Sequence, residues 1–149
     1  MKEILVRKLK EVTSEVLETM FYLVPEDLEG GSPGGEGEYV VEIPIEGGGT
    51  KAAIYLSFSS NLAEQMAANF LAEGEVSPPM IIDVLKEAAN MMGGNLVSAL
   101  DKKGEWKLGQ PQVYQGVEAY GMVIGLEPVC EFDVDGEILR VYAAGRRGG

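Results

Sequence analysis

The sequence predicts a single α+β domain in which a largely antiparallel β-sheet is packed by long amphipathic helices. Two segments, residues 2–23 and 78–101, repeat apolar side chains at the three- and four-residue spacing of a helix. Elsewhere, apolar and polar residues alternate in short runs separated by turn residues, which is typical of antiparallel strands. The expected order of elements is α-β-β-α-α-β-β-β. The length of 149 residues is usual for one domain, so residues 1–149 are expected to form a single unit.

The amino-terminal half predicts a helix followed by a hairpin. The helix over 2–23 is expected to end before Pro25, and the glycine-rich stretch 29–38 is expected to be a mobile loop. Alternating runs at 39–45 and 52–58 predict two paired strands. Pro44 lies within the first strand and favours an edge position or a bulge.

The carboxy-terminal half predicts two helices and then several strands. Asn61, followed by Glu64, has the spacing of a capping box and opens a short helix to about residue 72. Ser77 before Pro78 predicts the start of the long helix. Strand candidates follow around 113–117, 122–126, 129–134 and 138–143, and Asp135-Gly136 is expected to form the tight turn between the last two.

Composition excludes several functional classes. The chain has 24 acidic and 12 basic residues and a formal charge of −12, so binding to nucleic acid or anionic membranes is not expected. It has no histidine and one cysteine, Cys130, which excludes Ser-His and Cys-His catalysis and the usual zinc sites. We find no secretory signal and no apolar run of about 20 residues, so a cytoplasmic location is expected.

The helix over 78–101 carries an unusual polar stripe. Asp83, Glu87, Asn90 and Gly94 follow one another at spacings of four, three and four residues, which places them on one side of a helix, with Asp101 further along. Apolar residues occupy the opposite side and are expected to face the sheet. The stripe therefore faces either solvent alone or a partner, and Met91 flanks it as a possible adaptable contact.

The first helix contains a weaker version of this pattern. Ser14, Glu18 and Phe21 have the same spacing as Asp83, Glu87 and Asn90, which suggests an internal repeat. Phe21 has neither a hydrogen-bond donor nor an acceptor in its side chain, so this copy is not expected to position water.

These residues resemble the signature of the CheC, CheX and FliY group of chemotaxis phosphatases. That signature is an Asp or Ser, three residues, Glu, two residues, Asn and a later proline on a long surface helix. Asp83, Glu87 and Asn90 match it, and Pro111 is the candidate proline, two positions nearer to Asn90 than in the family pattern. The element order resembles that of the single-site, CheX-like branch over essentially the whole chain.

The resemblance implies an enzyme that hydrolyses the aspartyl phosphate of a CheY-like receiver domain in chemotaxis or two-component signalling. Asn90 would then position the attacking water and Glu87 would pair with the receiver lysine, with Asp83, Met91 and Gly94 in the partner contact. The protein would need no cofactor of its own, because the receiver supplies Mg2+. The resemblance also implies a homodimer, for which pairing edges are expected around Val40 or at the carboxy-terminal hairpin.

Two alternatives stay open at this point. The chain could be a non-catalytic receiver-binding adaptor or flagellar-switch-like module, which would keep the docking helix and hydrolyse nothing. It could also bind an unrelated small ligand, which predicts a concave pocket and a buried Asn90.

Overall fold

The computed structural model describes residues 2–28, 37–47, 49–100 and 105–145. These residues form an α+β fold with a seven-stranded antiparallel sheet in the order β1-β6-β7-β3-β2-β4, and β5 also pairs with β2. The elements are α1 (Lys2–Phe21), β1 (Glu26–Asp27), β2 (Tyr39–Gly47), β3 (Thr50–Phe58), α2 (Ser60–Leu71), α3 (Pro78–Leu100), β4 (Trp106–Leu108), β5 (Gln112–Gln115), α4 (Gly116–Val123), β6 (Cys130–Val134) and β7 (Glu137–Gly145). The predicted fold class and the order of its main elements are confirmed.

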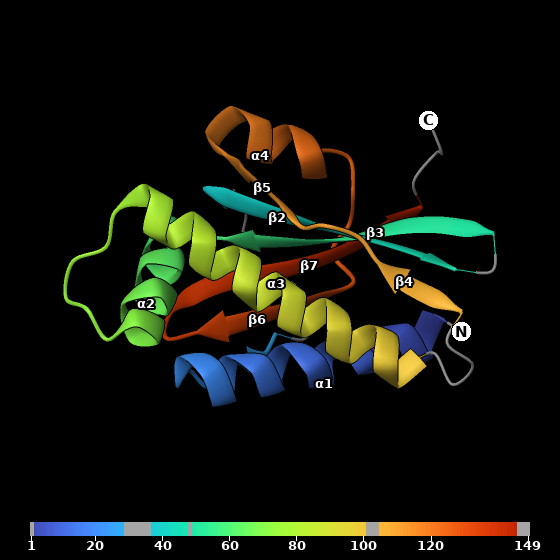
Figure 1. The fold of residues 1–149 in the computed structure, drawn as a ribbon, viewed down its shortest axis with the longest axis horizontal. Helices are drawn as coiled ribbons and strands as arrows, with labels where there is room; N and C mark the ends of the chain where they lie inside the picture. Colours follow the sequence, from blue (N-terminus) through green and yellow to red (C-terminus); the bar gives the residue numbers. More distant parts are fainter. Residues whose placement is uncertain (1, 29–36, 48, 101–104, 146–149) are drawn as a thin grey trace.

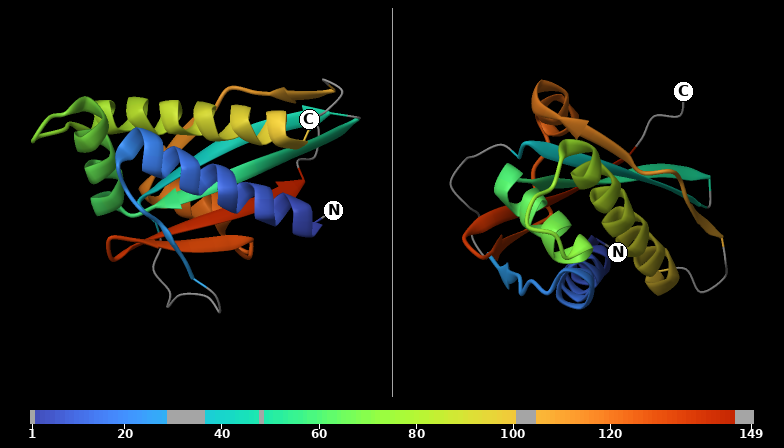
Figure 2. Two further views of the ribbon diagram at one scale, coloured as in Figure 1. Left: turned by 90° about the horizontal axis from the view of Figure 1, so that it is seen from below. Right: turned by 60° about the vertical axis from the view of Figure 1, so that its left-hand side comes forward.

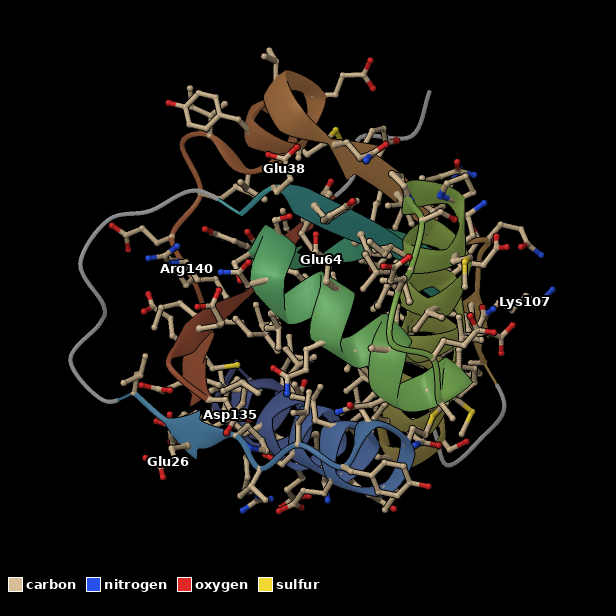
Figure 3. The ribbon with its side chains drawn as sticks, turned by 90° about the vertical axis from the view of Figure 1, so that its left-hand side faces the viewer. Glu26, Glu38, Glu64, Lys107, Asp135 and Arg140 are labelled. Atoms are coloured by element: carbon tan, nitrogen blue, oxygen red, sulfur yellow. The ribbon has the colours of Figure 1, made fainter. Side chains whose placement is uncertain are left out.

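The helices are divided between the two faces of the sheet. α1, α2 and α3 cover one face, and α4 lies on the other (Figure 1). α1 and α3 run side by side in opposite directions across the sheet (Figure 2). An end-on view shows α2 in front of this helical layer and α4 alone above the opposite face (Figure 3).

The main core lies between the sheet and the α1–α3 layer. Its fully buried side chains come from both helices and from the central strands, and the largest include Leu17, Phe21, Leu56, Phe58 and Leu85. Burial of one such side chain contributes about 1.5–3 kcal/mol relative to leaving it exposed. The core therefore fixes the rotation of α1 and α3 about their axes, and with it the residues that each helix presents to solvent.

α4 corrects the strand predicted at 122–126. Residues 116–123 form a helix, and its Ala119 is fully buried beside Val40 and Tyr142 on the second face of the sheet. The β-branched residues Val123 and Ile124 favour a strand by propensity, but a helix over 116–123 places Ala119, its buried residue, against the sheet. Tertiary context therefore overrides the local preference.

Pro44 does not form the predicted bulge, because β2 and β3 stay in one register through Pro44 and Ala53. Of the two predicted possibilities, the edge position is the nearer one, since the outer side of Pro44 lies at a gap in the strand pairing. The outer edge of β2 pairs with β4 at Ile45–Gly47 and with β5 at Tyr39–Glu42, and the ladder is interrupted between them. The carbonyl of Pro44 accepts a hydrogen bond from the Gly109 amide at 2.8 Å. Because the N and C=O of one strand residue point to the same side, the missing N–H of Pro44 lies at this interruption and costs no bond to β3.

The short helix α2 begins with a different cap from the predicted one. Ser59 is the N-cap, and its hydroxyl accepts a hydrogen bond from the Leu62 amide at 3.1 Å. Asn61 is exposed within the first turn, so the predicted capping box from Asn61 to Glu64 is wrong. Ser59, Ser60 and Asn61 all have cap-forming side chains, and local sequence does not distinguish them.

The carboxy-terminal hairpin forms as predicted. Asp135 and Gly136 connect β6 to β7 with φ angles of 52° and 86°, as a two-residue turn of the type I′ kind requires. The α3 prediction is also confirmed from Pro78 onward, whereas Asp101, residues 29–36 and the terminus from 146 lie outside the described residues.

The sheet edges differ from those expected for pairing with a second copy. Val40 is not at an edge, because β5 pairs with β2 and sets Tyr114 opposite Val40. At the other end of the sheet, β1 pairs with β6 through Asp27 and Phe132, so the outer strand of the hairpin is partly covered. Among the described residues, no helix is both long and apolar enough to cross a membrane.

Candidate functional site

The polar stripe of α3 lies on its solvent side because the opposite side is buried. The buried residues of α3 are Ile81, Val84, Leu85, Ala88, Ala89, Met92, Gly93 and Leu96. They contact the sheet and α1 and belong to the main core. Asp83, Glu87 and Asn90 are all exposed, which confirms the predicted outward orientation of the stripe. Exposure of Asn90 also disagrees with the alternative of a buried small-ligand site.

The polar groups of this stripe have no partners within the described part of the chain. The side chains of Asp83, Glu87 and Asn90 make no hydrogen bond and no ion pair with any described residue. Residues three apart on a helix have Cβ atoms about 5–6 Å from each other. The Glu87 carboxylate and the Asn90 amide therefore lie side by side on the solvent-facing surface of the helix. A carboxylate and an amide are thus held on a rigid helix and are available to another molecule.

Met91 and Gly94 shape the surface beside these groups. Met91 is 44% exposed and offers a flexible apolar contact. A Cβ atom added at Gly94 would meet nothing within 4 Å, so no neighbour in the structure requires a glycine there. Gly94 leaves open space at its position in the stripe, where a partner could approach the helix backbone closely.

Gly93, by contrast, faces the core, where an added side chain would meet other residues. A Cβ atom at Gly93 would lie 2.6 Å from Leu108 Cδ1 and 3.0 Å from Ile43 Cγ2. These distances are shorter than normal contacts, so Gly93 allows α3 to approach β2 and β4. The two neighbouring glycines therefore have different surroundings: Gly93 packs against the sheet, and Gly94 faces open space.

Pro111 lies in the connection between β4 and β5 and is buried. Both of these strands contact α3, and Gly109 in the same connection is bonded to Pro44. The connection is thus anchored beside α3, on the side that Gly93 faces. Its relation to the proline of the family signature stays a prediction.

Burial along the two long helices gives a different register from the predicted internal repeat. In α1 the buried positions are Leu9, Val12, Thr13, Val16, Leu17 and Phe21. In α3 the same spacing is found in Ile81, Val84, Leu85, Ala88, Ala89 and Gly93. When these sets are superposed, Asp83, Glu87 and Asn90 correspond to Glu11, Glu15 and Glu18, all of which are exposed.

The predicted repeat of Ser14, Glu18 and Phe21 is therefore wrong in register. Phe21 is fully buried, and its ring lies 5.6 Å from that of Phe70 between ring centroids. The Phe21 carbonyl also accepts a hydrogen bond from Asn69 Nδ2 at 2.8 Å, so the end of α1 is tied to α2. α1 presents three carboxylates where α3 presents two carboxylates and an amide.

Lys86, which the sequence pattern did not single out, is exposed on the same face. The sequence does contain a signal that could have identified it, because Lys86 is the only basic residue in α3. It precedes Glu87 directly and stands one turn before Asn90.

The described residues contain no group of three or more His, Cys, Asp or Glu side chains arranged to hold a metal ion. The arrangement on α3 can position a water molecule or contact a polar partner.

Comparison with known proteins gives consistent findings. A family model described as "Chemotaxis phosphatase CheX" matches residues 39–124, a span that includes all of α3. The chain is similar to the chemotaxis protein CheX of Vibrio vulnificus, with a TM-score of 0.80 and 19% identity over 98% of this chain and 99% of that one. No curated protein matches the chain.

Two other solved structures are similar to this chain. One is the CheX of a CheX-CheY-BeF3-Mg2+ complex from Borrelia burgdorferi, with a TM-score of 0.76 and 22% identity over 95% of this chain and 97% of that one. The other is a CheX from Desulfovibrio desulfuricans, with a TM-score of 0.74 and 18% identity over 95% of this chain and 99% of that one. At these identities the likeness establishes the fold.

Proposed function

The chain belongs to the chemotaxis phosphatase CheX family, and on that premise we propose that it hydrolyses the aspartyl phosphate of a CheY-like receiver domain. One observation carries the proposal. Glu87 and Asn90, one turn apart, are exposed and have no partner among the described residues, on a helix whose other side is buried. Such a helix can enter the active site of another protein without unfolding anything.

Hydrolysis of an aspartyl phosphate requires few catalytic groups from this protein. An acyl phosphate is already activated, so the main requirement is a water molecule placed in line with the phosphorus–oxygen bond that breaks. The solved Borrelia burgdorferi complex contains BeF3 and Mg2+ together with CheX and CheY. By analogy, the metal belongs to the receiver, and this chain provides no cofactor.

Asn90 is proposed to orient the attacking water. Its carboxamide oxygen accepts a hydrogen bond from water, and its position is fixed because Ala89 and Met92 beside it are buried. The water attacks phosphorus, the bond from phosphorus to the aspartyl oxygen breaks, and inorganic phosphate and the free carboxylate result. A fixed amide lowers the entropic cost of this arrangement, as water-positioning side chains do in other phosphoryl-transfer enzymes.

Glu87 is proposed to dock the helix by pairing with the lysine of the receiver. A carboxylate and an ammonium at an interface give a charge-assisted contact that fixes orientation. Asp83 lies one turn further along and would act at the rim of the contact, with Met91 and Gly94 completing the surface. Homodimer formation in this branch of the family stays a prediction for this chain.

The proposal is tested by following loss of the phosphoryl group from a phosphorylated CheY-type receiver in Mg2+. The purified chain is expected to accelerate the loss, and Asn90→Ala is expected to reduce the acceleration by about 10² or more. Asn61→Ala, which removes an exposed asparagine from α2, is the matched control and should retain full activity. Binding of the receiver without any acceleration by the wild-type chain would instead support a non-catalytic adaptor.

A further inference from the structure

Lys86 has the geometry of a contact residue in the proposed active surface. It is exposed on α3, and it lies four residues before Asn90 on the same side of the helix. Cβ atoms at this spacing are about 5–6 Å apart, and a lysine side chain extends further than that. The Lys86 ammonium can therefore reach the region of solvent that the Asn90 amide faces.

No intramolecular partner among the described residues neutralises this charge. Asp83 stands three residues before Lys86, yet no ion pair joins them in the structure. Other cations of the described chain do form such pairs, as Lys8 does with Glu11 and Lys10 with Asp27. Lys86 thus remains available for an anion from outside the protein.

The comparison with α1 gives a second reason. In α1, the exposed row Glu11, Glu15 and Glu18 has the same spacing as Asp83, Glu87 and Asn90, and Ser14 follows Glu11 by three residues as Lys86 follows Asp83. At these four positions α1 therefore has three negative charges and no positive one. α3 has Asp83, Glu87, Asn90 and Lys86, which sum to one negative charge. In a chain with a net charge of −12, the α3 face is the less repulsive of the two toward an anion.

We propose that Lys86 binds the phosphoryl-bearing edge of the receiver domain and thereby favours the phosphorylated partner over the unphosphorylated one. This inference rests on the proposed function. It assigns to the same site the recognition of whether the receiver is phosphorylated. A phosphoryl group adds negative charge and oxygen acceptors to the partner. Without Lys86, the charged side chains of α3 would be the carboxylates of Asp83 and Glu87 alone.

Lys86 acts at docking rather than at the chemical step. A contact made equally in the bound complex and in the transition state changes KM and leaves kcat nearly unchanged. An exposed contact between full charges is also weakened by salt, because the screening length falls to about 3 Å at 1 M. These two properties distinguish the role of Lys86 from that of Asn90, which is expected to change kcat.

The test compares Lys86→Gln with Lys107→Gln in the full chain. Lys107 is an exposed lysine on β4, and its side chain projects into solvent on the flank of α3 (Figure 3). At low salt, Lys86→Gln is expected to lower kcat/KM by about fivefold through KM, whereas Lys107→Gln should stay within about twofold of the wild type. The loss should disappear at about 1 M salt, and Lys86→Arg should retain activity. Equal losses in the two glutamine variants, or a loss confined to kcat, would overturn the inference.

The same variants separate failure of this inference from failure of the proposed function. If the wild-type chain accelerates dephosphorylation and Lys86→Gln behaves like Lys107→Gln, the proposed function stands and the role of Lys86 is wrong. If the wild-type chain does not accelerate it, binding is measured with a receiver loaded with BeF3 and Mg2+ and with the unloaded receiver. A weaker preference for the loaded receiver in Lys86→Gln alone supports the inference, and an unchanged preference refutes it.

Discussion

Replacement of Gly94 by alanine is predicted to stabilise the fold while it weakens docking of the receiver. Gly94 is inside α3, its φ is not in the left-handed region, and an added Cβ atom would meet nothing within 4 Å. A glycine in a helix interior costs about 0.8–1 kcal/mol relative to alanine. Because no clash opposes this gain, Gly94→Ala should raise the free energy of unfolding by about 1 kcal/mol.

The neighbouring residue is the matched control. Gly93→Ala brings the same gain in helix propensity, but its Cβ would lie 2.6 Å from Leu108 Cδ1 and 3.0 Å from Ile43 Cγ2. Overpacking of this kind costs about 1–3 kcal/mol. The two variants should therefore differ in stability by about 1–3 kcal/mol, with Gly94→Ala the more stable.

Urea or thermal unfolding measures this difference. For a chain of this length, 1 kcal/mol corresponds to a shift in Tm of about 2–4 °C. Gly94→Ala should unfold above the wild type and Gly93→Ala below it. Equal stabilities, or destabilisation by Gly94→Ala, would refute the assignment of Gly93 to packing and of Gly94 to the open surface.

The activity of the same variant tests the role of Gly94 at the partner surface. If receiver loops approach the helix backbone there, a larger side chain such as leucine should raise KM more than alanine does, although both variants remain folded. Unchanged KM in Gly94→Leu would show that no partner group comes close to this position.

Two further predictions concern stability and reactivity elsewhere in the fold. Ser59→Ala should destabilise the protein by about 1–2 kcal/mol in urea unfolding, since it removes the cap of α2 and the 2.6 Å hydrogen bond from Ser59 to Glu137, whereas Ser60→Ala should have little effect. Burial raises the pKa of the Cys130 thiol from 9.0 to about 12. A thiol reagent at pH 8 should therefore modify unfolded protein rapidly and native protein hardly at all, and stability should fall as the pH rises from about 9 toward 12, because the unfolded chain releases the thiol proton first. Rapid modification of the native protein at pH 8 would contradict the burial of this thiol.

The outward position of Asp83, Glu87 and Asn90 could be predicted from the sequence because α3 has a continuous apolar face. Buried positions recur at intervals of three and four along its length, and such a pattern leaves only one rotation of the helix that hides them all. Lys86 falls in the same exposed sector, and its role as the only cation of the helix could have been recognised from the same pattern.

Other features of the site depend on contacts that no local pattern contains. Gly93 and Gly94 are indistinguishable in sequence, and only the approach of Leu108 and Ile43 separates them. The predicted repeat, which matched α1 to α3 by residue type, also failed because it did not include contacts between helices. Phe21 is buried because α2 packs on the end of α1, whereas Asn90, its counterpart in the predicted repeat, is exposed.

The sequence by itself determined the fold class, the long helices, the hairpins at 39–58 and 130–145, and the exposed stripe of α3. All of these follow from periodic burial and turn residues, which act within one element and its immediate neighbour. The tertiary structure alone decided that 116–123 is a helix, that β5 covers Val40, and that Ser59 caps α2. In these cases several local states have similar free energies, and contacts between residues far apart in the sequence select one of them.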